Sequence, residues 1–162
     1  MRLKTKVKID SNSIEKAIEQ RGRKILSAAA QKISKDMYDE AVSAIEDFYN
    51  GYSPRYYKRT LQFKNNAFRR YFLNSHATKY HGGVQLTPEL MSGYVSLNGE
   101  DVTSLVYSLV VYSGKHGMAE NFGAPPSPTT VPPLITRLYM KQDEIVNNID
   151  SYLAYGISVS GM

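Results

Sequence analysis

The sequence contains no cysteine and no tryptophan. The absence of cysteine excludes disulfides, a cysteine nucleophile and metal sites with thiolate ligands, and it fits assembly in a reducing cytosol. The longest nearly apolar run, residues 105–112, is far shorter than the roughly 20 residues of a membrane-spanning helix, so we expect no membrane contact. The opening residues MRLKTKVKID hold no uninterrupted apolar run, which argues against a signal peptide.

Motifs of catalysis and nucleotide binding are absent as well. The chain has neither a phosphate-binding GxxxxGK nor a dinucleotide-binding GxGxxG. Its three histidines are His76, His81 and His116, and the first two lie five apart in a polar segment, which is not a zinc-ligand spacing. A small enzyme built on the segment of His76 and His81 is one hypothesis. The lack of a nucleophile, base and orienting group in one motif leads us to predict no enzyme, no cofactor and no metal.

A chain of 162 residues is expected to form one domain over residues 1–162. Its net charge of +5 is unevenly distributed: residues 1–72 hold sixteen Lys and Arg against eight Asp and Glu, and residues 73–162 hold four against seven. Thirteen tyrosines suit surfaces where the ring is covered and the hydroxyl stays in water. This asymmetry is typical of a nucleic-acid face or of head-to-tail pairing between subunits.

Apolar residues at steps of three, four and seven predict one long helix from about residue 12 to residue 49. Gly22 weakens it and is a candidate kink, and the Asn-Gly pair at 50–51 ends it. At about 55 Å the helix outreaches a chain of this size, so we expect part of it to lie on a neighbouring subunit or diagonally across its own sheet. Its acidic residues predict a solvated face, or partners for a neighbouring copy: Asp36, Asp39, Glu40, Glu46 and Asp47.

The remaining pattern predicts an α+β fold, with the long N-terminal helix packed on a small antiparallel sheet. Residues 1–11 are expected to be an edge strand or a flexible arm, and residues 74–83 a loop. Two strands, 90–97 and 102–112, flank the hairpin signal Asn-Gly at 98–99. A proline-rich extended loop over 124–133 then leads to a C-terminal helix that starts at residue 134, and the tail beyond residue 154 is expected to fray.

The most distinctive stretch is residues 51–72, GYSPRYYKRTLQFKNNAFRRYF, which has six basic residues, no acidic ones and interleaved aromatic rings. Cations and flat rings together suit a phosphate backbone. They equally suit a half-buried strand or a subunit contact with snorkelling side chains. The candidate residues for contact with a subunit or with DNA are Arg55, Tyr56, Tyr57, Lys58, Arg59, Arg69 and Arg70.

The predicted order of elements over residues 12–150 resembles the minor tail component family of long-tailed double-stranded DNA bacteriophages, the neck or tail-completion proteins. YYKRTL at residues 56–61 is similar to the family's Tyr-Tyr-x-Arg-Thr-like run after the long helix. ENFG at residues 120–123 is similar to its Glu-Phe-Gly-like turn before a proline loop. The chain differs by lacking the glycine that often follows Arg-Thr and by inserting Asn121.

The resemblance implies a structural virion protein of the neck or tail, assembled in the host cytoplasm. Copies would form a ring around the DNA channel, with six as the expected number, and would meet tail-tube and head-completion or connector proteins. It implies nonspecific DNA contact in the channel and an interface turn at Glu120, Phe122 and Gly123. The alternative is a free-standing, nonspecific nucleic-acid-binding module that uses residues 51–72.

Overall fold

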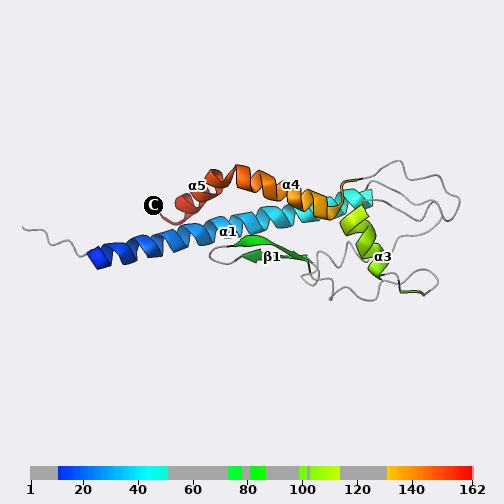
Figure 1. The fold of residues 1–162 in the computed structure, drawn as a ribbon, viewed down its shortest axis with the longest axis horizontal. Helices are drawn as coiled ribbons and strands as arrows, with labels where there is room; N and C mark the ends of the chain where they lie inside the picture. The colour runs from blue at the N-terminus through cyan, green and yellow to red at the C-terminus, as the bar shows by residue number, and fades with distance from the viewer. Residues whose placement is uncertain are drawn as a thin grey trace, which may run out of the picture.

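In a computed structural model of the chain, the structure describes residues 11–50, 73–77, 81–86, 99–101, 103–113 and 131–161. The expectations for residues 1–10, 51–72 and 114–130, and for the strand at 90–97, lie outside these ranges. The elements in chain order are α1 (Ser11–Asn50), β1 (Leu73–Ala77), β2 (Gly82–Leu86), α3 (Thr103–Ser108), the π-helical turn η2 (Leu109–Ser113), α4 (Leu134–Asn147) and α5 (Ile149–Val159) (Figure 1).

The long helix α1 is the axis on which the other elements lie, and its existence and bounds confirm the prediction. Its 40 residues correspond to about 60 Å, and they run through Gly22 without a break. Small residues dominate the buried positions of its second half, so neighbouring backbone can approach closely. Three ion pairs at i,i+4 spacing support the helix: Glu19–Arg23 and Lys35–Asp39 are exposed, and Lys32–Asp36 is partly buried.

The two C-terminal helices run antiparallel to α1 along one side of it (Figure 1). α4 begins directly after Pro132 and Pro133, as predicted, because proline fits the position ahead of a first helical turn. The prediction of one continuous helix was wrong, since Asn148 interrupts it with φ −116° and ψ 24°. The expected fraying beyond residue 154 was also wrong, because α5 continues to Val159.

A β1–β2 hairpin lies on the opposite side of α1 (Figure 1). Its antiparallel register pairs Leu73 with Leu86 and Ala77 with Gly82. The hairpin comes very close to α1: a Cβ on Gly82 would lie 2.1 Å from the carbonyl oxygen of Ala30. The prediction of a loop over residues 74–83 was therefore wrong for residues 74–77 and 82–83, and residues 78–80 lie outside the described ranges. The glycine that suggested a loop allows the strand to approach the helix.

Residues 103–113 are helical, which overturns the predicted strand over residues 102–112. The side chain of Asp101 accepts a hydrogen bond from the backbone N–H of Thr103 at 2.8 Å, which supports the start of α3. Tyr107, Val110 and Val111 are spaced as one helical face, and both valines are buried in the main core together with residues of α1 and α4. Packing on that face outweighs the β propensity of the segment, which is a weak and context-dependent preference.

The main core lies around the second half of α1, where the hairpin, η2 and α4 converge. The α+β class predicted from the sequence is wrong, because the described residues are mostly helical and their one pair of strands is a short hairpin outside the predicted sheet region. A second, smaller cluster of Ala29, Ile145 and Tyr152 joins α1 to α4 and α5. The buried members of the main core are Ala41, Ala44, Ile45, Phe48, Val110, Val111, Leu134 and Leu138.

Candidate functional site

The contact residues predicted from the sequence lie outside the described part of the chain. This applies to the basic and aromatic residues of 51–72 and to the expected interface turn at 120–123. Their roles stay predictions. The structure instead describes two features that bear on function: a polar seam between α1 and the C-terminal helices, and exposed apolar surfaces on the same helices.

The histidines of the enzyme hypothesis fall on the hairpin. His76 lies in β1 opposite Gly83, and His81 is exposed immediately before β2. Among the residues that the structure describes, no group of three or more His, Asp and Glu side chains could hold a metal ion. The helices described are also too short or too polar to cross a membrane.

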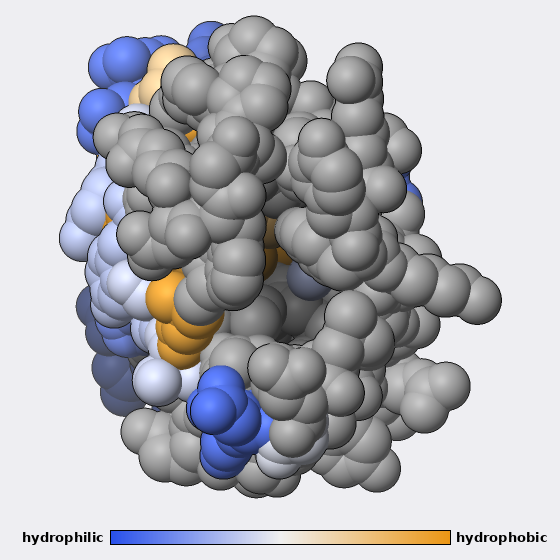
Figure 2. Space-filling model, turned by 90° about the vertical axis from the view of Figure 1, so that its right-hand side faces the viewer, coloured by the Kyte–Doolittle hydropathy of each residue, from blue (hydrophilic) through white to orange (hydrophobic). Residues whose placement is uncertain are grey.

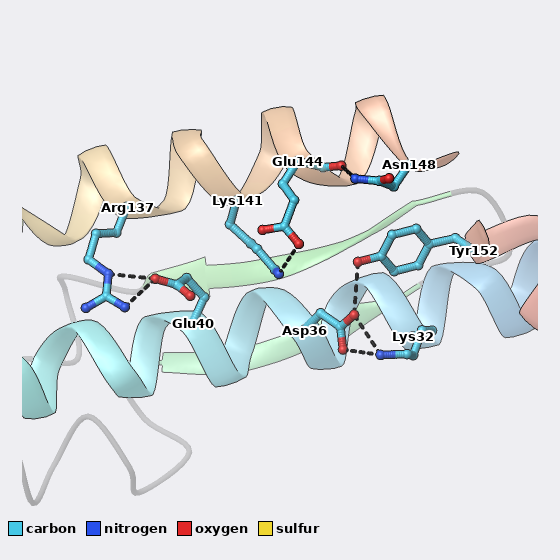
Figure 3. Close-up of polar contacts among 8 residues, drawn as sticks. All are labelled: Lys32, Asp36, Glu40, Arg137, Lys141, Glu144, Asn148 and Tyr152. Atoms are coloured by element: carbon cyan, nitrogen blue, oxygen red, sulfur yellow. Dashed lines mark hydrogen bonds and ion pairs between the residues drawn. The ribbon is translucent and has the colours of Figure 1, made fainter. Parts of the chain in front are cut away.

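Arg137 anchors one end of the polar seam (Figure 3). Its Nε donates to Glu40 Oε1 at 2.6 Å, another of its nitrogens pairs with Asp47, and Nη2 donates to Ser43 Oγ at 3.2 Å. Glu40, Ser43 and Asp47 are spaced three and four apart, so they form one row on α1. Burial alone lowers the pKa of Arg137, but the hydrogen bonds and charges of Asp47 and Glu40 outweigh it and raise that pKa above its ordinary value.

Asp36 continues this row toward the other end of the seam (Figure 3). Its Oδ2 accepts hydrogen bonds from Lys32 at 2.7 Å and from the Tyr152 hydroxyl at 2.9 Å. Burial raises the pKa of Asp36, but the hydrogen bonds from Lys32 and Tyr152 and the charges of Lys32 and Lys141 bring it below its ordinary value. Burial first, and then the ionised Asp36, raise the pKa of Tyr152 to about 12. The carboxylate and the phenol therefore form a stable pair at neutral pH.

Replacing Tyr152 with phenylalanine is expected to lower the free energy of unfolding by about 1.5 kcal/mol at pH 7, the size of one hydrogen bond to a charged group. The folded protein holds the phenolic proton more tightly than the unfolded chain, whose tyrosine has a pKa near 10.0. The contribution of Tyr152 is therefore complete below pH 10 and is lost as the pH rises toward about 12. Urea unfolding at a series of pH values measures it.

Tyr139→Phe is the matched control, because that tyrosine is exposed on the outer side of α4. It should leave stability unchanged at every pH. Lys32, Lys141 and Glu144 also face this part of the seam and are common to all three proteins. A difference between wild type and Tyr152→Phe that stays constant from pH 7 to 12 would contradict the assignment.

The seam corrects one of the two interpretations of the acidic residues of α1. Asp36, Glu40 and Asp47 pair with α4 and α5 of the same copy, so these three residues are not simply a solvated face. Their contact with a neighbouring copy stays a prediction. Arg137 was not among the residues predicted from the sequence. The spacing of Asp36, Glu40 and Asp47 by four and seven was the available signal, because it places three carboxylates on one row of the helix.

The first turns of α1 extend past the end of α5 (Figure 1). All ten residues from 11 to 20 are exposed, including Ile14 at 47% and Ile18 at 65%. A shallow open depression runs along this part of the helix. We call its lining the overhang surface: Ile14, Ala17, Ile18, Gln20, Arg21 and Lys24.

A second apolar region lies on the side of α4 that faces away from α1. Leu138 and Ile145 are buried, whereas the side chains between and beside them on the opposite face are between 61% and 64% exposed. Asp143 is exposed among them. We call this set the α4 outer surface: Tyr139, Met140, Asp143 and Val146.

Figure 2 views the molecule from the end at which α1 finishes. The described residues visible there are mainly hydrophilic, with small, separate hydrophobic patches. Isolated exposed apolar residues are normal on soluble proteins, whereas rows of them on one helix indicate a surface that another molecule covers. The overhang and α4 outer surfaces are therefore two candidate interaction sites among the described residues.

Comparison with protein-family models, with curated proteins and with solved structures gives no match for this chain.

Proposed function

We propose that the chain is a structural subunit of the neck or tail of a long-tailed double-stranded DNA bacteriophage. Copies would form a ring, with six as the expected number, around the DNA channel and join the tail tube to head-completion or connector proteins. The sequence resemblance supplies the phage context. The order of a long first helix and a helical C-terminus agrees with that resemblance, although the sheet expected between them does not.

The observation that carries the proposal is the exposed first part of α1. Residues 11–20 pass beyond α5 with every side chain exposed, and isoleucines recur on one face. Apolar side chains that recur on one exposed face of a helix indicate a surface that another molecule covers. Supply of a binding surface to neighbours is the expected property of a ring subunit.

The test is the mass and shape of the protein alone and on phage tails. Light scattering and electron microscopy of the purified chain, with and without tails from the phage that encodes it, should show a closed oligomer or a ring formed on the tail. Particles lacking the protein should accumulate unjoined heads and tails, and adding it should restore joining.

Two results would count against this function. One is a chain that stays monomeric at all concentrations, even with tails present, together with normal particles in its absence. The other is a monomer that binds DNA with a steep loss of affinity as salt rises and loses that binding in the triple variant Arg55→Ala, Lys58→Ala, Arg59→Ala, which would favour the nucleic-acid-binding module.

A further inference from the structure

The overhang surface extends the row of α1 that receives α5. Ile14, Ile18, Arg21 and Ile25 are spaced four, three and four apart, so they lie on one side of the helix. α5 packs closely at the last of them, since a Cβ on Gly156 would lie 2.5 Å from the carbonyl oxygen of Ile25. Toward the N-terminus the same row is exposed. A helix from another molecule can therefore continue the packing that α5 begins.

Charge on the overhang argues against a partner identical to the overhang itself. Four basic residues and two acidic ones occupy positions 15–24, and one acidic residue, Glu19, is already paired with Arg23. Within the described residues, Arg21 and Lys24 take part in no ion pair. Two overhangs laid together would bring like charges into contact, which is unfavourable. The complementary surface must be apolar and acidic.

The α4 outer surface has that chemistry. Tyr139, Met140 and Val146 are exposed around Asp143, and no described residue forms an ion pair with that carboxylate. The two surfaces are also of similar length, since residues 14–24 rise by about 15 Å and residues 139–146 by about 10 Å. Each is a helix face with apolar side chains beside charges of opposite sign.

The distribution of charge along α1 points the same way. Residues 11–35 hold six basic residues and two acidic ones, and residues 36–50 hold five acidic residues and no basic one. This order opposes the helix macrodipole, which favours acidic groups near the N-terminus and basic groups near the C-terminus. The acidic half is compensated in part by Arg137 of the same copy. In the basic half, Arg23, Lys32 and Lys35 pair with acidic residues of α1 itself. Lys16, Arg21 and Lys24 form no ion pair with a described residue, so a second molecule can supply one.

We infer that the overhang surface of one copy docks on the α4 outer surface of the next copy, with Arg21 and Lys24 facing Asp143. This contact rests on the proposed function, because it assigns the joint between neighbouring ring subunits. It is heterologous: each copy offers one surface to each neighbour, and such contacts close into a ring when the rotation between copies permits.

Cysteine cross-linking tests the contact directly, because the natural chain has no cysteine. Full-length Ile18→Cys and Met140→Cys chains are mixed in equal amounts under mild oxidation and separated without reductant. The expected product is a mixed dimer, and a chain with both substitutions should give a ladder of oligomers. Gln31→Cys is the matched control, because Gln31 is exposed on α1 outside the overhang surface and should cross-link to Met140→Cys far less.

Exchange of the charges at Asp143 and Arg21 is the second part of the test. Asp143→Arg in the Met140→Cys chain should reduce the mixed dimer about tenfold, which corresponds to about 1.4 kcal/mol. Adding Arg21→Asp to the Ile18→Cys chain should restore it. These positions are exposed, so thermal unfolding of every variant should match the parent and exclude misfolding as the cause.

Three results would overturn the inference: dimers of Ile18→Cys alone that form as readily as mixed ones, a mixed yield no higher than the Gln31→Cys control, or no effect of charge exchange. Different results would contradict the proposed function. Cross-linked ladders from a protein that neither binds tails nor restores head joining would support the contact and contradict the phage role. Rings on tails without these cross-links would support the phage role and contradict the contact.

Discussion

Gly82→Ala should lower the free energy of unfolding by about 3 kcal/mol, near the upper end for overpacking a buried contact. The new Cβ would lie 2.1 Å from the carbonyl oxygen of Ala30 and 2.9 Å from Ile33 Cβ. Both belong to the backbone or stem of α1, so neither can rotate away, and the hairpin must move off the helix. Ser34, which is buried and donates to the carbonyl oxygen of Gly83 at 2.7 Å, would then lose its partner.

Gly83→Ala is the matched control, because a Cβ on Gly83 meets no atom within 4 Å. It keeps the carbonyl that Ser34 uses and should change stability by less than about 0.5 kcal/mol. Urea denaturation followed by circular dichroism compares the two variants with wild type. Equal stability of Gly82→Ala and Gly83→Ala would show that the hairpin does not pack on α1 as described.

Arg137→Met should also be costly, at about 3 kcal/mol, because removing one partner of a buried ion pair leaves the other charge uncompensated. The side chain of Arg137 is 19% exposed and that of Glu40 is 25% exposed, which puts the expected loss at the lower end for buried pairs. Asp47 is more exposed and contributes less. Methionine keeps most of the apolar stem, so the loss reports on charge and hydrogen bonds. Chemical denaturation measures it.

Arg23→Met makes the same chemical change at an exposed pair. Arg23 is 50% exposed and pairs with Glu19 on its own helix, so the expected loss is below about 0.5 kcal/mol. The double variant Arg137→Met, Glu40→Gln should recover part of the stability, since it removes the uncompensated carboxylate. If Arg137→Met costs no more than Arg23→Met, the seam does not hold α4 on α1.

The helices at both ends of the chain could be predicted from the sequence because their apolar residues repeat at steps of three, four and seven. Buried Ala41, Ala44, Ile45 and Phe48 follow that repeat in α1, and Leu134, Leu138 and Ile145 follow it in α4. Periodicity does not say which part of a stripe is covered. Ile14 and Ile18 belong to the same stripe as the core residues, yet they are exposed because α5 ends before reaching them.

The middle of the chain could not be predicted, because local propensity and tertiary packing disagree there. Residues 102–112 are rich in β-branched and aromatic side chains, but Val110 and Val111 are buried on a helical face instead. The hairpin could not be predicted for a different reason. Its strands are held by pairing and by the approach of Gly82 to α1, neither of which leaves an alternating apolar pattern in the sequence.

The contact stretch predicted from the sequence, residues 51–72, lies outside the described residues. Arg137 and Asp143 were not predicted to belong to a site. A lone cation and a lone carboxylate on a helix carry no local signature. Arg137 becomes recognisable only when the fold places it opposite Glu40, Ser43 and Asp47. Asp143 differs from other exposed acids only through its exposed apolar neighbours on α4. The partners of Arg137 and the exposure of the residues around Asp143 both depend on how α4 packs against α1.

The overhang of α1 has a consequence for the speed and cost of assembly. Forming the first turn of a helix is the expensive step, and each later turn adds one hydrogen bond per residue fixed. In this chain the nucleus is provided by the packed second half of α1, so the exposed turns from Ser11 onward need only propagate from it. A docking surface built in this way is already in its bound shape before it meets a partner, and binding pays little ordering entropy at the moment of contact.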